Sequence, residues 1–273
     1  GSNNMFAVHM GLVFLIVCIS AVLFSISVLF EDNKTGYLAT LFFIIFSFTY
    51  DPLDVLAFNT EWPAAFFSSL GAYFLLKYIL IEKNNFLLFS GISFGLGFFS
   101  KQVILFHFLS ALLFLYFVHK QNINQLIKSA MSLITGFLIT AIFFVLYFAL
   151  NNASNDFVFW FWEYHSKFYI PAMSIPERIE SALRYLQMPD SFVRINFFLP
   201  VSFIIGVFVT IADLFSGKGG IRKGSLANLY FVMWGLFAYI GASYSGRYFG
   251  HYFILILPPF CILASMTVGI LFS

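Results

Sequence analysis

Long apolar blocks alternate with short polar connections along the whole chain. A membrane-spanning helix needs about 20 apolar residues. Backbone amides in lipid must pair within their own segment, so every block is predicted as an α-helix. We therefore expect an all-α polytopic membrane helix bundle with about nine transmembrane helices, forming a single domain over residues 5–273. The nine blocks are Phe6–Phe30, Tyr37–Tyr50, Trp62–Ile81, Phe86–Ser100, Gln102–Val118, Leu126–Leu150, Asn196–Phe215, Leu226–Ser243 and Phe249–Phe272.

The composition supports a chain whose main solvent is lipid. It is 61% hydrophobic and only 10% charged, with a mean hydropathy of +0.92, whereas soluble domains carry about 25% charged residues. The net charge of +2 gives no indication of nucleic-acid binding. Cys18 and Cys261 both fall inside apolar blocks, so they are predicted to be free thiols and not a disulfide.

The basic residues of the short connections predict an orientation, because cytoplasmic loops are enriched in Lys and Arg. One set of alternate connections holds only Lys101 and Arg247. The other set should therefore be cytoplasmic, and it holds Lys34, Lys77, Lys83, Lys120, Lys128, Lys218, Arg222 and Lys223. The integral membrane protein would then face the extracytoplasmic side with its acidic connections, most simply across a bacterial plasma membrane.

One connection is long, spanning residues 151–195, and a loop of this length is typically functional. Ser174 and Glu177 form a capping-box pattern, and Ile179, Leu183 and Leu186 share one helical face. We expect an amphipathic helix in this outer loop, lying flat on the extracytoplasmic membrane surface.

Two apolar blocks are too short to reach the outer boundary of the hydrocarbon core, which is about 30 Å thick. Tyr37–Tyr50 covers about 21 Å and ends at Asp51, where Pro52 discourages a helical continuation. Phe86–Ser100 covers about 22 Å and ends at Lys101. Charged, non-helical backbone at this depth requires a protein-lined or watery cavity, so a recess open to the outside is predicted.

The last apolar block is preceded by the stretch SGRYFGHY. If this stretch is helical, Arg247 and His251 share a face, with Tyr248 and Tyr252 beside them. Arg offers a planar fork of donors that suits phosphate, and Lys offers a compact positive charge. Ionisable groups at membrane depth are costly and usually functional. The candidate residues are Asp51, Asp54 and Glu61 as catalytic acids or bases, and Lys101, Arg247, His251, Tyr248 and Tyr252 as a phosphate-binding set.

Three motifs in this order, AFNTEW, GISFGLGFFSKQVILF and SGRYFGHYFILILPP, resemble the membrane glycosyltransferases of the GT-C class. The resemblance is closest to protein O-mannosyltransferases and the lipid A aminoarabinose transferase. It implies an inverting enzyme that transfers a sugar from a polyprenyl-phosphate donor to a glycan, lipid or protein acceptor on the extracytoplasmic face. The motif residues of the family fall on Asn59, Thr60, Glu61, Lys101, Gln102 and Arg247.

The chain departs from the family at its start. Family members carry their catalytic acid in the first outer loop, but the first acids here are Glu31 and Asp32, on the predicted cytoplasmic side. We therefore expect an N-terminally truncated piece without that loop, which would be inactive by itself. Asp51 or Asp54 could replace the missing base. The sequence leaves open whether a divalent metal cofactor is needed.

Each candidate residue also has a plainer interpretation. Asp51 and Asp54 fit a solvated Asp-Pro turn, and Glu61 fits a helix N-terminus. Lys101 could extend to the lipid headgroups, and Arg247 with His251 could anchor a helix at the interface. The remaining candidates outside this set are His107, predicted to be a hydrogen-bonded core histidine, and Glu163 with His165, two metal-ligand types without a third.

Two other functions remain as alternatives to the transferase. Transporters often have internal repeats and polar groups near the membrane midplane, but no repeat is evident and the charges gather at one end. A non-catalytic membrane scaffold or a lipid-binding partner subunit is the second alternative, and a truncated chain would fit it.

Overall fold

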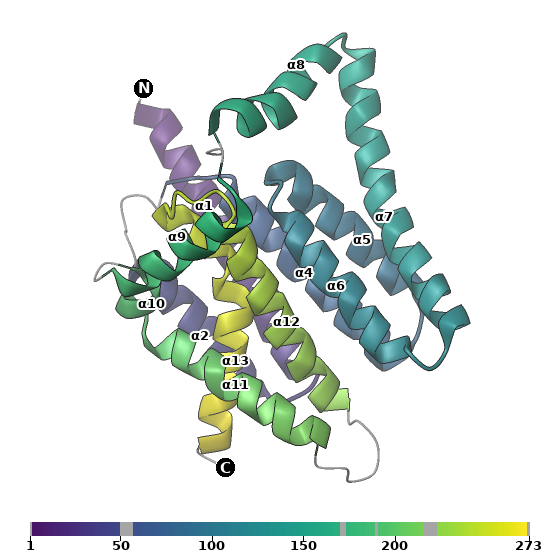
Figure 1. Cartoon of the computed structure of the whole chain (residues 1–273), viewed down its shortest axis with the longest axis vertical. Coiled ribbons are helices and arrows are strands. Elements are labelled where there is room, and N and C mark those ends of the chain that lie inside the picture. Colours follow the sequence, from purple (N-terminus) through teal and green to yellow (C-terminus); the bar gives the residue numbers. More distant parts are fainter. Residues whose placement is uncertain (1, 50–56, 170–172, 189–190, 216–222, 272–273) are drawn as a thin grey trace.

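The computed structural model describes residues 2–49, 57–169, 173–188, 191–215 and 223–271, and within these ranges all regular secondary structure is helical (Figure 1). The predicted all-α membrane helix bundle is confirmed. The α-helices are α1 (Ser2–Val28), α2 (Asn33–Thr49), α4 (Glu61–Ile81), α5 (Asn84–Ser100), α6 (Ile104–His119), α7 (Ile123–Leu150), α8 (Ser154–Val158), α9 (Ile175–Gln187), α10 (Phe192–Ile195), α11 (Phe198–Phe215), α12 (Lys223–Ser243) and α13 (Leu257–Leu271). Two π-helices, η1 (Phe159–Glu163) and η2 (His165–Tyr169), and the 3₁₀-helix η3 (Gly250–Leu255) complete the described part.

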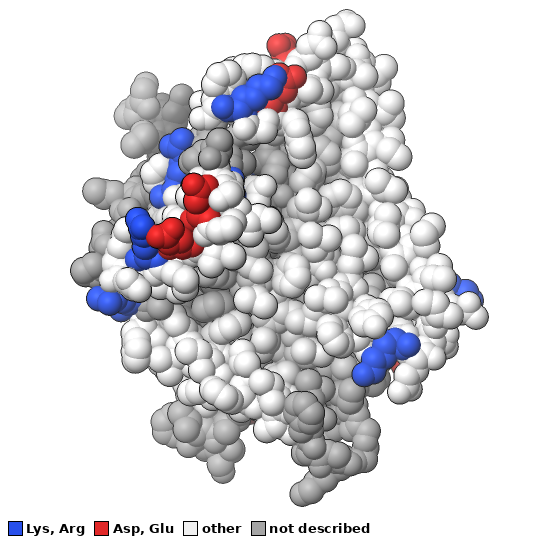
Figure 2. Space-filling model, in the orientation of Figure 1, with Lys and Arg blue, Asp and Glu red and all other residues white. Residues whose placement is uncertain are grey.

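Four of the described helices are long and apolar enough to cross a membrane. These stretches are Phe6–Val28, Glu61–Ile81, Ile123–Leu150 and Gly224–Ser243. The other predicted spans correspond to shorter helices, among them α6 and α13. On the visible face, charged side chains gather at the top and left and at the lower right of the view, with a broad uncharged surface between them (Figure 2). This distribution fits a protein whose middle is solvated by lipid.

Glycines allow the closest helix contact in the bundle, between α5 and α7. A Cβ atom on Gly91 would lie 2.0 Å from the Leu133 carbonyl oxygen, and one on Gly136 would lie 2.1 Å from the Leu88 carbonyl oxygen. The two backbones therefore touch where side chains are absent, which is typical of helix pairs in membranes. The remaining surface of α7 is largely exposed, and in Figure 1 this helix stands at the edge of the bundle.

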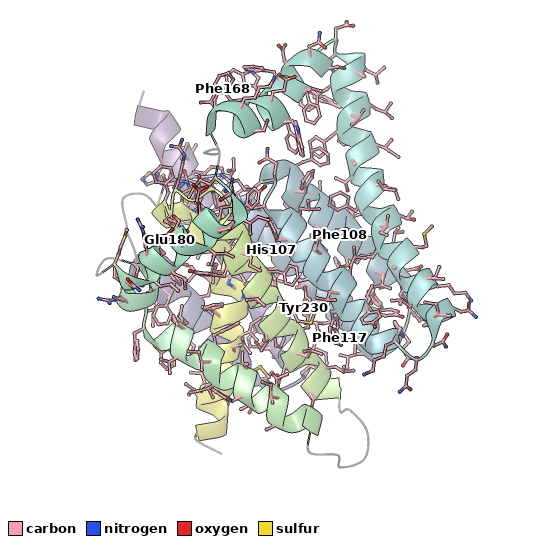
Figure 3. The ribbon with its side chains drawn as sticks, viewed as in Figure 1. His107, Phe108, Phe117, Phe168, Glu180 and Tyr230 are labelled. Atoms are coloured by element: carbon pink, nitrogen blue, oxygen red, sulfur yellow. The ribbon has the colours of Figure 1, made fainter. Side chains whose placement is uncertain are left out.

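Buried polar groups link several helices. His107 of α6 is fully buried, and its Nδ1 accepts a hydrogen bond of 2.8 Å from the indole N–H of Trp234 on α12. Figure 3 shows His107 and Tyr230 in the region where α6 and α12 meet. The predicted hydrogen-bonded core histidine is thereby confirmed. A second link joins α4 to α7, because the Tyr78 hydroxyl lies 2.7 Å from the Ser129 hydroxyl.

Residues 154–169 form a segment that we call the strap, made of α8, η1 and η2. It leads back from the end of α7 over the helices α4 to α6 (Figure 1). Stacked rings hold it, since Phe157 stacks on Phe148 at 4.5 Å and Phe161 stacks on Phe99 at 5.4 Å between centroids. The Gln102 side-chain amide adds a hydrogen bond of 2.8 Å to the Phe161 carbonyl oxygen.

The helix predicted in the long connection is α9, and its capping box is present. The Glu177 carboxylate accepts hydrogen bonds from the Ser174 backbone N–H at 2.6 Å and hydroxyl at 2.8 Å. Ile179 and Leu183 are both 56% exposed, so α9 carries an apolar face that the protein itself does not cover. Its location on the extracytoplasmic surface stays a prediction.

Candidate functional site

The site begins at the first residue of α4. Glu61 opens this helix directly after Thr60, whose hydroxyl lies 3.3 Å from Glu61 Oε2. A carboxylate is favourable at this position because the N-terminal end of a helix carries partial positive charge. The Glu61 side chain is only 1% exposed, so its charge is held inside the protein and needs a partner.

The partner is Lys101, at the interruption between α5 and α6. The residue leaves helical conformation, with φ −154° and ψ 120°, and α6 begins at Ile104. This break directs Lys101 Nζ to 2.7 Å from Glu61 Oε1, with the lysine side chain 19% exposed. The short apolar block before Lys101 therefore ends in a nearly buried ion pair.

Two residues of η3 complete the surroundings of this ion pair. His251 Nε2 lies 3.8 Å from Glu61 Oε1, and the Lys101 Nζ lies 4.9 Å from the centre of the Tyr252 ring. A cation over a tyrosine face is attracted by the ring electrons. The structure thus brings together one carboxylate, one ammonium group, one imidazole and one phenol ring from three separate parts of the chain.

The stretch SGRYFGHY is not α-helical, which corrects the proposed shared helical face of Arg247 and His251. Gly246 has φ +70° and Tyr248 has φ +51°, both in the left-handed region, and η3 begins only at Gly250. The predicted continuous span Phe249–Phe272 is therefore wrong at its start, because α13 begins at Leu257. Arg247 lies in the non-helical part and is exposed.

The other predicted site residues divide into two groups. Asp51 and Asp54 lie outside the described residues. Glu163 pairs with Lys167 through an ion pair of 2.7 Å, and the described residues contain no group of three metal-ligand side chains. The observed arrangement of Glu61, Lys101 and His251 leaves their catalytic and phosphate-binding roles as predictions.

An apolar cavity of about 290 Å³ adjoins the ion pair. Lys101 and Gln102 lie in its wall, together with Tyr252 from η3 and Phe161 and Trp162 from the strap. The cavity therefore lies between the α5–α6 break, the strap and the end of α12. An elongated apolar group in it would have one end beside the Lys101 ammonium.

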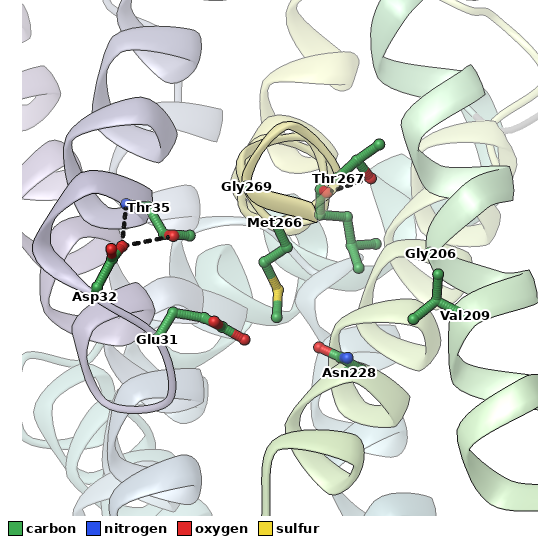
Figure 4. Close-up of a pocket in the computed structure, with 10 residues that line it drawn as sticks. Glu31, Asp32, Thr35, Gly206, Val209, Asn228, Met266, Thr267 and Gly269 are labelled. Carbon is green, nitrogen blue, oxygen red and sulfur yellow. Dashed lines mark hydrogen bonds between the residues drawn. The ribbon is translucent and has the colours of Figure 1, made fainter. Parts of the chain in front are cut away.

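A second cavity of about 260 Å³ lies between the α1–α2 turn and helices α11 to α13 (Figure 4). Asp32 caps α2 by accepting hydrogen bonds from the backbone N–H and the hydroxyl of Thr35, at 2.8 and 2.9 Å. Glu31 and Asn228 point into the same space beside Met266. Desolvation and the neighbouring Asp32 raise the pKa of Glu31 above its ordinary value.

The sequence did not indicate the residues that support the site through contacts with its neighbouring segments. Tyr185 of α9 stacks on Tyr248, and Gln102 fastens the strap, although the family motif had marked Gln102 without a role. A capping box and an apolar face predict α9 itself, but neither indicates where Tyr185 packs. The buried Tyr185 on a helix that is otherwise mostly exposed is apparent only in the folded structure.

The helices and the paired charges at one end define an integral membrane helix bundle with a polar site beside an apolar cavity. Residues 1–148, more than half of the chain, match the family described as dolichyl-phosphate-mannose-protein mannosyltransferase, and the chain belongs to this family. Membership indicates a membrane glycosyltransferase that uses polyprenyl-phosphate sugar donors in general. No curated protein and no solved structure matches the chain at a significant level.

Proposed function

We propose that the ion-pair region of this chain binds the phosphate of a polyprenyl-phosphate sugar, from which a glycosyl group is transferred to an acceptor at the extracytoplasmic face. The observation that carries the proposal is the double contact of Lys101. Its ammonium group lies 2.7 Å from the buried Glu61 carboxylate, and the same side chain lines the apolar cavity. A phosphate beside Lys101 would leave the attached prenyl chain next to apolar walls.

A donor phosphate at Lys101 would compete with the Glu61 carboxylate, which already pairs with the ammonium group. Lys101 is already neutralised by Glu61, so a donor phosphate would take the place of the carboxylate. The released Glu61 carboxylate would remain near His251, whose Nε2 lies 3.8 Å away. Arg247, on the segment before η3, supplies a guanidinium group whose planar donors suit phosphate oxygens.

The transfer itself requires a base and a stabilised leaving group. A carboxylate takes the proton from the acceptor hydroxyl or amine, and the acceptor atom attacks the anomeric carbon of the sugar. The bond between this carbon and the phosphate oxygen breaks, and its electron pair stays on the prenyl phosphate. Fixed cations stabilise the developing charge. Lys101 and Arg247 are proposed for this role, and Asp51, Asp54 and Glu61 are the candidates for the base.

The direct test is binding of radiolabelled undecaprenyl phosphate to the purified chain in nanodiscs. Lys101→Met keeps an unbranched side chain that is one atom shorter and removes its charge, so it should weaken binding at least tenfold, a loss of about 1.4 kcal/mol. Lys77→Met is the matched control, because it removes the same charge at a position within α4 where the ammonium group lies over the rings of Tyr73 and Phe86. Equal binding by the unaltered chain and Lys101→Met would refute the proposed site.

A further inference from the structure

The segment from Gly246 to Phe253 contacts two different parts of the protein. His251 and Tyr252 lie on the side of the ion pair. The His251 ring nitrogen is 3.8 Å from the Glu61 carboxylate, and the Tyr252 ring centre is 4.9 Å from the Lys101 ammonium. Tyr248 and Phe253 instead stack on Tyr185 of α9. The same short segment therefore connects α9 with the residues that face the ion pair.

Tyr185 makes the central contact of this second side. Its ring lies 4.4 Å from that of Tyr248 with 9° between the planes, and 5.2 Å from that of Phe253 with 18° between the planes. The side chain is 5% exposed, and its hydroxyl accepts a 2.8 Å hydrogen bond from the backbone N–H of Phe192. The ring is thus fixed on both faces and at its hydroxyl end.

The backbone at Tyr248 explains why a fixed partner is needed. Its φ of +51° is unfavourable for a residue with a side chain, and such conformations persist only where surrounding contacts enforce them. Arg247 lies between this residue and Gly246, which has φ +70°. The direction of the Arg247 side chain therefore depends on two left-handed residues, of which only the glycine adopts this conformation at little cost.

Helix α9 and the residue Met173 before it are also attached at Tyr244 and at Gly246, the start of this segment. The Arg178 guanidinium lies 4.8 Å over the ring of Tyr244 and donates a hydrogen bond to the Tyr244 carbonyl oxygen. Met173 packs against Gly246, where an added Cβ would lie 3.1 Å from its sulfur. These contacts fix the position of α9, and therefore the position of the Tyr185 ring against Tyr248.

We propose that Tyr185 is a positioning residue of the donor-phosphate site, which by stacking on Tyr248 holds the left-handed turn that directs Arg247 toward the phosphate. This inference rests on the proposed function, since it assigns the phosphate contact to Arg247. The aromatic ring performs this role, and the hydroxyl group serves to anchor the ring to Phe192. An isolated loss of the hydroxyl is therefore tolerated, whereas a loss of the ring is not.

The test measures undecaprenyl phosphate binding to chains in nanodiscs at several salt concentrations. Tyr185→Phe keeps both stacks and should bind within about twofold of the unaltered chain, whereas Tyr185→Leu should bind about tenfold more weakly. Tyr185→Leu should also have the weaker salt dependence of Arg247→Met, because one cation no longer contacts the phosphate. Tyr147→Leu, at an exposed position on α7, is the control and should leave binding unchanged.

A double variant shows whether Tyr185 acts through Arg247. Tyr185→Leu combined with Arg247→Met should bind no more weakly than Arg247→Met alone, because residues that act through one contact are not additive. If Tyr185→Leu does not fold, Tyr248→Leu removes the same stack from the other side. Full additivity, or unchanged binding by Tyr185→Leu while Arg247→Met binds weakly, would overturn the inference alone. Unchanged binding by both Lys101→Met and Arg247→Met would overturn the proposed function with it.

Discussion

Lys101 Nζ lies 2.7 Å from Oε1 of Glu61, and the two residues stand at ends of different helices, α5 and α4. The carboxylate is 1% exposed, so the contact holds two opposite charges almost out of water. Such a pair contributes little net stability, yet removing one partner leaves a buried charge without compensation. The complete ion pair therefore adds little to the stability of the fold, whereas the loss of one partner lowers this stability strongly.

Loss of the Lys101 charge alone should destabilise the chain. Lys101→Met leaves the Glu61 carboxylate buried and unpaired, which should lower the free energy of unfolding by about 3 kcal/mol. The double variant Glu61→Gln with Lys101→Met removes both charges and should recover most of this loss. Thermal unfolding in detergent measures both effects. Equal melting temperatures for the single and double variants would contradict the interpretation of a buried ion pair.

Loss of the Glu61 charge should have the opposite effect on donor binding. Glu61 competes with a phosphate for Lys101, so Glu61→Gln should bind undecaprenyl phosphate more tightly, by about threefold to tenfold at most. The measurement is the dissociation constant in nanodiscs, with Glu180→Gln on α9 as a control because Glu180 is exposed and pairs with the exposed Arg184. Binding as weak as that of Lys101→Met would show that Glu61 holds Lys101 in place instead of competing with the ligand.

The contact between α5 and α7 should tolerate no side chain at its glycines. A Cβ atom at Gly91 would lie 2.0 Å from a backbone oxygen, which no rotamer change relieves, so Gly91→Ala should cost more than about 2 kcal/mol of stability. Gly224→Ala is the control, because nothing lies within 4 Å of the added atom. Unfolding by increasing denaturing detergent measures the difference. A Gly91→Ala chain as stable as the control would exclude the observed helix contact.

The turn between α1 and α2 should give a pH-dependent stability. Since desolvation raises the pKa of Glu31 above its ordinary 4.5, the folded chain binds this proton more tightly than the unfolded chain. Stability from this group is present below pH 4.5 and is lost as the pH rises through the raised pKa. Glu31→Gln should therefore raise the melting temperature at pH 7, by an equivalent of less than about 1 kcal/mol because solvent screens an exposed carboxylate. The gain should vanish below pH 4.5.

Asp32, next to Glu31, provides a control in which the expected change in melting temperature has the opposite sign. Hydrogen bonds from Thr35 lower the pKa of Asp32, so its stabilising effect is present at neutral pH and is lost as the pH falls through the lowered pKa. Asp32→Asn should lower the melting temperature at pH 7. If Glu31→Gln and Asp32→Asn shift it in the same direction, the assignment of the two carboxylates is wrong.

The sequence predicts the membrane class, the positions of most helices and a polar recess at one charged residue. Lys101 follows an apolar block too short for a bilayer, and this length alone indicated a polar recess. The ion pair between Lys101 and Glu61 could not be predicted from the sequence, because the spacing of residues does not indicate which helix ends lie side by side. The shared helical face of Arg247 and His251 failed because Tyr248 adopts a left-handed conformation that its residue type disfavours. Contacts with α9 enforce this conformation, and such long-range contacts have no local signal.

The unequal lengths of neighbouring helices have a consequence for the lipid itself. Helix α7, with 28 residues, is about 42 Å long, whereas its partner α5, with 17 residues, is about 25 Å long. No bilayer with a hydrocarbon thickness of about 30 Å matches both. Hydrophobic mismatch of this kind is relieved by tilting of the long helix and local thinning around the short one. Thinning beside α5 would bring headgroups and water down to Lys101, so that a lipid-borne substrate would approach sideways from the membrane instead of through a pore.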